Sequence, residues 1–83
     1  MQNFSTVDLD LTTALVTHLG LTFPSVESNG RLAAFVFDFP EERIHPAVDS
    51  YFNRTLQVDA RTFAENRRSL VTAMHQARGN RLA

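Results

Sequence analysis

The arginines are the residues of this chain best suited to bind another molecule. All eight of its cationic side chains are arginine, whose planar and permanently charged fork matches phosphate and carboxylate groups. Six of them lie in the last 33 residues beside two acidic residues, whereas residues 1–50 hold two arginines and seven acids. A GC-rich genome would also favour arginine over lysine, so the residue type alone establishes no function. The clustering at one end is harder to explain by codon usage, and it marks a candidate surface for an anionic partner.

Four of these arginines fall on a long helix that the C-terminal sequence predicts. Around that helix Arg67 and Arg78 lie within about 20° of each other, and Arg61 and Arg68 form a second row roughly 120° further round. Such a strip could contact phosphates and bind them in a salt-sensitive manner. It could equally be a solvated surface whose arginines pair with acids of the N-terminal half. The pI near 6.2 and the lack of an interleaved aromatic residue weigh against strong nucleic-acid binding.

Other residue types that could carry chemistry form no recognisable site. The chain has no cysteine, and its histidines lack the spacing of metal ligands, so we expect His18 to be a core or boundary residue with one hydrogen bond. Glu41 and Glu42 would point about 100° apart on a helix and suit its positive N-terminal end. Asp8 and Asp10 lack the rest of a calcium loop. We therefore expect no enzyme, no cofactor and no metal site.

Length and composition limit the chain to one domain. Its 83 residues, 43% of them hydrophobic, suffice for a single core over residues 1–83, with residues 79–83 expected to fray. A chain of this size buries only about 60–65% of its unfolded surface, so its stability should be modest unless it self-associates. No apolar run approaches the roughly 20 residues of a membrane span, and no signal segment is evident, so we expect a cytoplasmic protein.

The N-terminal half predicts a helix followed by a β-hairpin. Ser5 and Asp8 resemble a capping box before a helix over about residues 7–19, and Gly20 is its expected left-handed cap. Asn29-Gly30 is typical of a type I′ turn, which would join strands at residues 21–27 and 31–38. Because Pro24 cannot donate to a ladder, the first strand should lie at an edge. In this register Arg31 pairs with Ser28, Ala34 lies opposite Ser25, and Val36 lies opposite Phe23.

The second predicted strand is apolar on both faces. Phe35 and Phe37 point to one face, and Leu32, Ala34 and Val36 point to the other. A strand of this kind is normally covered on both sides. Either helices cover both faces, or one face meets a second copy or a partner. We take Phe35 and Phe37 as the candidate interaction or dimer face.

Two helices are expected in the C-terminal half. Pro40 opens a helical segment that Pro46 interrupts, giving a short turn at residues 41–45 and a helix over 46–52, capped by Asn53 in the left-handed conformation. Residues 54–58 form an extended connector or a short third strand. Asp59 then caps the longest helix, which runs to about Arg78 and stops at Gly79. The expected core face of this helix comprises Phe63, Leu70, Met74 and Ala77, with Ala73 at its edge.

Several short motifs resemble one known family. They are Asp8, Ala14-Leu15, Leu19-Gly20, Phe35-Val36-Phe37-Asp38, Tyr51-Phe52-Asn53, Val58-Asp59-Ala60-Arg61 and Phe63. With this order of elements, the chain resembles a small bacterial and phage-associated family catalogued only as a domain of unknown function. The resemblance implies an α-β-β-α-α domain in a phage or mobile-element setting. It implies no activity, cofactor or catalytic residue.

Taken together, the sequence predicts an α+β domain with the order helix, two-stranded antiparallel hairpin, short helix and long C-terminal helix. The expected function is a small non-enzymatic interaction module that forms a homodimer or docks on a protein partner. The alternative is an accessory factor that binds nucleic acid or a nucleoprotein through Arg61, Arg67, Arg68 and Arg78. Neither hypothesis involves a membrane or a small-molecule substrate.

Overall fold

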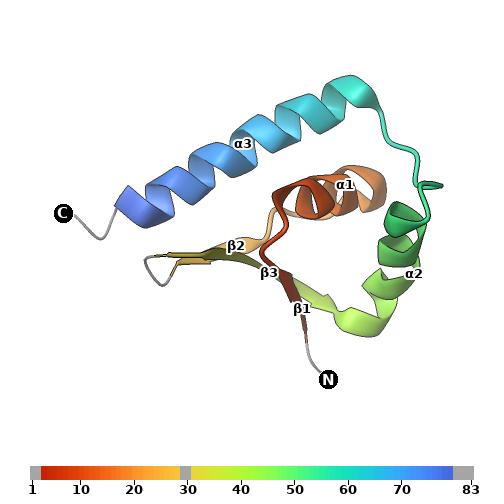
Figure 1. Cartoon of the computed structure of the whole chain (residues 1–83), viewed down its shortest axis with the longest axis horizontal. Helices are drawn as coiled ribbons and strands as arrows, with labels where there is room; N and C mark the ends of the chain where they lie inside the picture. Colours follow the sequence, from red (N-terminus) through yellow and green to blue (C-terminus); the bar gives the residue numbers. More distant parts are fainter. Residues whose placement is uncertain (1–2, 29–30, 80–83) are drawn as a thin grey trace.

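A three-stranded antiparallel sheet and three helices make up the fold (Figure 1). The computed structural model describes residues 3–28 and 31–79. The expected α+β class and the order helix, strand, strand, helix, helix are confirmed, but an additional strand precedes the first helix, so the expected two-stranded hairpin is wrong. The elements are β1 (Asn3–Thr6), α1 (Leu9–Leu19), β2 (Ser25–Ser28), β3 (Ala33–Pro40), α2 (Glu41–Phe52) and α3 (Ala60–Gly79).

The sheet has the strand order β1-β3-β2, so β3 is central. Pairing of β2 with β3 runs from Ser28 opposite Ala33 to Ser25 opposite Val36, which corrects the expected register by two residues. The connection therefore spans four residues, and the expected turn residues Asn29 and Gly30 lie outside the described part of the chain. A two-residue shift keeps every side chain on its predicted face, because side chains alternate with a period of two.

One face of β3 forms the core of the domain. Ala33, Phe35 and Phe37 are buried there, and the rings of Phe37 and Phe4 lie 5.8 Å apart between centroids. The apolar faces of α1 and α2 complete this core. In Figure 1 the helices lie on one side of the sheet and around its end. Phe35 and Phe37 thus contact the chain's own helices and strands, which corrects their assignment to an interaction face.

Local capping interactions position α1. The Asp8 carboxylate accepts a hydrogen bond of 2.9 Å from the Leu11 backbone N–H, and Gly20 adopts the expected left-handed conformation with φ 65°. Ser5 lies in β1, so the expected capping box is wrong and Asp8 is itself the N-cap. The buried hydroxyls of Thr12 and Thr13 donate to backbone carbonyls four residues earlier at 2.8 Å. These bonds satisfy polar groups that would otherwise destabilise the core.

Helix α2 is continuous, which corrects the expected break at Pro46. The exposed Pro46 lies inside the helix. It removes one backbone hydrogen bond, while Ile44 and Ala47 on either side of it are buried and hold the helix against the core. The left-handed residue after the helix is Arg54, with φ 63°, rather than Asn53. No strand forms over residues 54–58.

Helix α3 begins at the expected cap. Asp59 Oδ2 accepts hydrogen bonds from the backbone N–H and the hydroxyl of Thr62 at 2.8 and 2.7 Å. These bonds, led by the one from the hydroxyl, lower the pKa of the Asp59 carboxyl. Leu70 is fully buried, whereas the rest of the predicted core face is half-buried. Within the part of the chain that the structure describes, no helix is both long and apolar enough to cross a membrane.

Candidate functional site

The face of the sheet opposite the core is the strongest candidate for a binding surface. On β3 it presents Ala34 and Val36, which are half-buried, and Asp38, which is exposed. The pairing places Glu27 of β2 beside Ala34, and it places Ser5 of β1 and Ser25 of β2 on either side of Val36. We call this surface the open sheet face, and it comprises Ser5, Val7, Ser25, Glu27, Leu32, Ala34, Val36 and Asp38.

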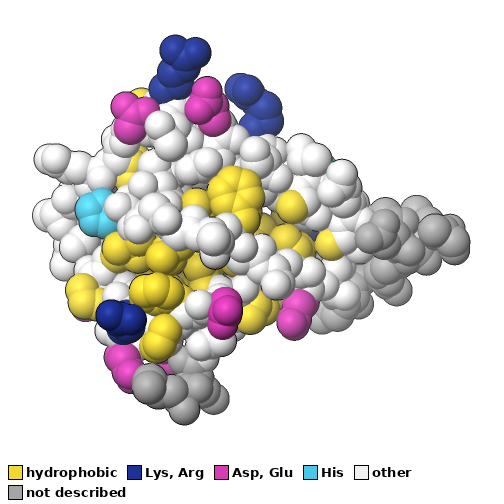
Figure 2. Space-filling view, turned by 180° about the vertical axis from the view of Figure 1, so that it is seen from behind, with side chains coloured by type: hydrophobic (Ala, Val, Ile, Leu, Met, Phe, Trp, Pro, Cys, Tyr) yellow, Lys and Arg dark blue, Asp and Glu magenta, His cyan; other side chains and the backbone are white. Residues whose placement is uncertain are grey.

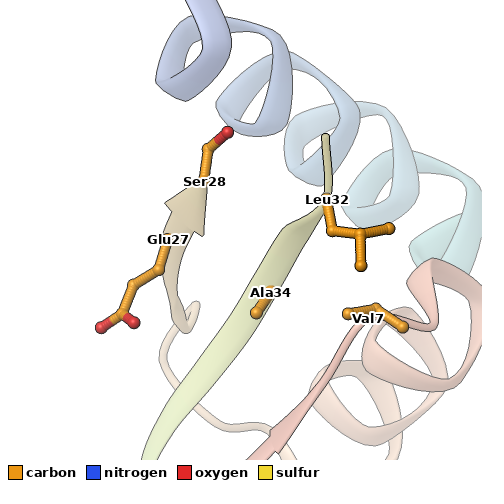
Figure 3. A pocket seen from close by; sticks show the side chains of 5 residues that line it. All are labelled: Val7, Glu27, Ser28, Leu32 and Ala34. Atoms are coloured by element: carbon orange, nitrogen blue, oxygen red, sulfur yellow. The ribbon is translucent and has the colours of Figure 1, made fainter. Parts of the chain in front are cut away.

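Two exposed apolar side chains enlarge this surface at one end. Val7 and Leu32 are each 57% exposed. Figure 3 shows them pointing toward one another beside Ala34, while the carboxylate of Glu27 is turned away from them. Together with Ser28 these four residues line a shallow hollow of about 310 Å³. Its lining is apolar at the centre, with one carboxylate at its margin, which suits an apolar side chain of a partner better than a reacting substrate.

The charges on the open sheet face are of one sign. Glu27 and Asp38 are exposed there, and the residues that define the face include no arginine or histidine. A partner with the same sign of charge would be repelled, and a basic partner attracted. The open sheet face is therefore apolar at its middle and acidic at its margins.

The predicted arginine strip on α3 is divided by ion pairs. Arg67 Nε lies 2.8 Å from Asp10 Oδ1 of α1, and Arg61 Nε lies 3.7 Å from Glu65 Oε2 one turn along α3. The Arg67–Asp10 pair links α3 to α1. It agrees with the alternative in which arginines of a solvated surface pair with acids of the N-terminal half. The second pair is loose, and the Arg61 side chain is 90% exposed. Arg61 thus remains open to a partner, whereas Arg67 serves the contact between α1 and α3.

The other two arginines of the strip lie on the solvent side of α3. Arg68 and Arg78 are exposed, and neither forms an ion pair with any other described residue. Val71, between them in sequence, is half-buried. The structure therefore brings Arg61 and Arg68 together on one exposed row, whereas Arg78 lies on the side of the helix that also carries Arg67.

Contacts between α1 and α3 hold the two helices together beneath this row. Besides the Arg67–Asp10 pair, Asn66 Nδ2 donates a hydrogen bond of 3.0 Å to Thr17 Oγ1, which itself donates to the Thr13 carbonyl. Asn66 was absent from the predicted core face because an amide is not an apolar residue. Asn66 lies three residues after Phe63 and four before Leu70, and this helical spacing indicates that it shares their face of α3.

His18 and His45 each contact a single partner. His18 is exposed and contacts the Gln57 carbonyl through Nδ1 at 3.1 Å, so the expected single hydrogen bond is confirmed but a core position is not. His45 Nε2 lies 3.1 Å from Glu41 Oε1, beside a second hollow of about 270 Å³ that also touches Glu42. Over residues 3–28 and 31–79, no three His, Cys, Asp or Glu side chains are close enough to hold a metal ion.

Hydrophobic side chains are also exposed outside the open sheet face. Seen from behind, the molecule has hydrophobic side chains across its middle and arginine and acidic side chains along its upper and lower margins (Figure 2). Phe52, at the end of α2, is 64% exposed and packs edge-on against Tyr51 with the ring centroids 5.2 Å apart. Because Phe52 belongs to a helix end rather than to the sheet, it offers a control surface of similar chemistry.

Sequence reasoning missed Val7 and Glu27 as surface residues. The sequence predicted Val7 in the first helix, but it follows β1. The alternation of side-chain direction along Ser5, Thr6 and Val7 is the signal that places it on the face of Ser5. Glu27 was treated only as part of a hairpin. Comparison with known proteins adds no assignment: no family model, no curated protein and no solved structure matches this chain. The resemblance to a domain family of unknown function therefore stays a prediction.

Proposed function

We propose that this chain is a small non-enzymatic interaction module that binds protein through the open sheet face, with a second copy of itself as the first candidate partner. The observation that carries the proposal is the one-sided cover of the sheet. Helices pack on the face of Phe35 and Phe37, while the other face presents Val7, Leu32, Ala34 and Val36. The cytoplasmic location and the phage or mobile-element setting expected from the sequence stay part of this proposal.

Burial of the open sheet face would supply a useful free energy of association. Full burial of a valine or leucine side chain contributes about 1.5–3 kcal/mol, so covering the exposed halves of Val7 and Leu32 would contribute about 1 kcal/mol each. The edges of the sheet are poorer templates, because β1 and β2 have only four residues each and short edge strands resist pairing. The face, rather than an edge, is therefore the better binding surface.

Sedimentation equilibrium over a wide range of protein concentration tests self-association. Wild-type protein is expected to form oligomers, and Val7→Ser and Leu32→Ser should each weaken them. Phe52→Ser removes a comparable exposed apolar side chain elsewhere and should leave the association unchanged. Circular dichroism confirms that each variant is folded. A wild-type chain that stays monomeric at the highest concentration would remove the support for self-association.

A second candidate function is binding of nucleic acid by α3. It is supported by the exposure of Arg68 and Arg78 and by the absence of an ion-pair partner for either among the described residues. Fluorescence anisotropy with labelled duplex and single-stranded DNA at low and moderate salt tests it. Replacing Arg68 and Arg78 by Gln should weaken binding and flatten its salt dependence, whereas Arg67→Gln, which alters an internal ion pair, should do neither. An absence of binding in dilute salt excludes this function.

A further inference from the structure

We propose that the open sheet face binds the solvent side of α3 of a second copy, so that chains associate head to tail. This inference rests on the proposed function, and it specifies which surface of the partner is used and how copies are arranged. It is carried by charge complementarity between two surfaces of the same chain.

The charges argue against two copies meeting by the same face. In a symmetric dimer through the open sheet face, Glu27 and Asp38 of one copy would face the same acids of the other. Opposed like charges disfavour an interface, whereas opposite charges favour it and fix its register. The open sheet face therefore suits a basic surface, and the chain carries one on α3.

The solvent side of α3 has this basic character. Arg61 and Arg68 are seven residues apart, so they lie within about 20° of each other around the helix and about 10.5 Å apart along it. Both side chains are exposed, and a third exposed arginine, Arg78, lies toward the C-terminal end about 80° away from Arg68 around the helix. Within α3 the only acid is Glu65. The opposite side of the helix, around the buried Leu70, is held against α1.

The spacing of the acids matches that of the arginines. Glu27 lies opposite Ala34, and Asp38 lies four residues further along β3, so the two acids are separated by roughly 14 Å between Cα positions. This distance and the spacing of Arg61 and Arg68 differ by less than the length of an arginine side chain. One helix laid on the sheet could therefore bring both arginines to both acids.

The apolar parts of the two surfaces also correspond. On α3 the side chains of Ala64 and Val71 fall between the arginines, within about 60° of Arg68 around the helix. On the open sheet face Ala34 and Val36 lie between the acids. Small residues allow a helix to approach a sheet closely, and a helix covering this face would add the third layer that the sheet of one chain lacks.

A contact of this kind has a defined consequence for assembly. The two surfaces are different, so the interface is heterologous, and each bound copy leaves one free surface of each kind. Such contacts form rings or open chains rather than closing as two-fold dimers. Oligomers larger than dimers are therefore expected at high protein concentration, and they should weaken as salt screens the charges.

Charge reversal tests the contact. Glu27→Arg and Arg68→Glu should each weaken association about tenfold or more, because each places like charges together. Combining both changes in one chain, or mixing the two single variants, should restore much of the association. Glu42→Arg and Arg54→Glu make the same changes of net charge at exposed positions outside both surfaces and serve as controls. Sedimentation equilibrium gives the association constants, and circular dichroism confirms the fold of each variant.

The outcomes separate this inference from the proposed function. Restoration by the double variant supports head-to-tail association. Stronger association of Glu27→Arg together with an unchanged Arg68→Glu variant indicates a symmetric sheet-to-sheet dimer, which overturns the inference but keeps the open sheet face as the binding surface. A monomer under all conditions overturns the inference and removes self-association from the proposed function.

Discussion

The two faces of β3 should respond to side-chain truncation by very different amounts. Phe37 is 1% exposed and packs against Phe4 and the apolar faces of α1 and α2. Leu32, just before the strand, is 57% exposed on the other side. Replacing each residue by Ala in turn therefore tests the assignment of faces on which the candidate binding surface depends.

The expected costs follow from burial. Truncation of a buried phenylalanine to alanine lowers the free energy of unfolding by about 3–5 kcal/mol. For Leu32 a little under half of the side chain is removed from water, and full burial is worth about 1.5–3 kcal/mol, so Leu32→Ala should cost about 1 kcal/mol. At about 0.05–0.15 kcal/mol per residue, a domain of this length has a total stability of about 4–12 kcal/mol. Phe37→Ala therefore removes a large part of this stability, and nearly all of it at the low end of the range, whereas Leu32→Ala leaves a folded protein.

Urea denaturation followed by circular dichroism measures both costs. It is performed at a protein concentration low enough to keep the chain monomeric, so that association does not add to the stability. Phe37→Leu, a smaller truncation that should cost less than Phe37→Ala, replaces Phe37→Ala if the alanine variant does not fold. The urea midpoint should shift while the dependence of the unfolding free energy on urea stays constant.

Two results would contradict this assignment of faces. A cost for Leu32→Ala as large as that for Phe37→Ala would mean that the open sheet face is covered within the monomer. A negligible cost for both Phe37 variants would mean that the core lies elsewhere. At higher protein concentration the wild-type midpoint should rise and that of Leu32→Ala should rise less, because only the folded state associates.

Three further predictions concern helix caps and titrating groups. Asp8→Ala should lower the unfolding free energy by about 1 kcal/mol, whereas Ser5→Ala should change it by less than about 0.5 kcal/mol. Equal costs in urea denaturation would instead support a capping box formed by Ser5 and Asp8. Thr62→Val should raise the pKa of Asp59 toward its ordinary value in an NMR titration, because the threonine hydroxyl makes the leading contribution to lowering it. The folded-state pKa of Asp59 lies below the unfolded one, so this stabilisation is present above the ordinary value and is lost as pH falls through the folded-state pKa. Burial, helped by the charge of Asp8, raises the pKa of Tyr51, so its phenol should ionise above its ordinary range in an absorbance titration, and the associated stability should be lost as pH rises through that raised pKa.

The elements that could be predicted from the sequence are those set by a few adjacent residues. Gly20 ends α1 because a residue without a side chain enters the left-handed conformation easily, and Asp59 begins α3 because its carboxylate accepts from the next turn. The alternation of side chains between the two faces of β3 likewise depends only on neighbouring residues of the strand. Each of these features depends on the backbone within about one turn or one strand, so the sequence contains nearly all the information needed.

The features that were missed depend on parts of the chain that are distant in sequence. β1 has four residues and no periodic apolar pattern, and it is a strand because β3 offers a free edge. The β2–β3 register depends on a four-residue connection, which the Asn-Gly pair did not indicate. Pro46 stays inside α2 because burial of Ile44 and Ala47 offsets one missing backbone hydrogen bond. In each case tertiary packing decided between local alternatives.

For the candidate site, the sequence predicted the two apolar faces but not which one the helices would cover. Both faces of β3 carry apolar residues, and the sequence alone predicted the phenylalanine face as the candidate interface. The large rings instead fill the core, where they bury the most apolar surface, and the smaller Ala34 and Val36 remain on the open sheet face. An aromatic residue on a two-faced strand of a small domain is thus better assigned to the core than to a partner.

The separation of charge along the sequence does not map directly onto two ends of the molecule. Part of it cancels within the fold, because Arg67 of the basic half pairs with Asp10 of the acidic half at 2.8 Å. Glu27 and Asp38 remain at the margins of the sheet, Glu41, Glu42 and Asp49 remain on α2, and a basic row remains on α3. Because α3 is held on the helical side of the domain, the acids of the sheet and the basic row face different directions and cannot neutralise each other within one chain. In the proposed head-to-tail contact they would do so between chains, and this is why we relate the charge pattern to association of copies before an anionic ligand.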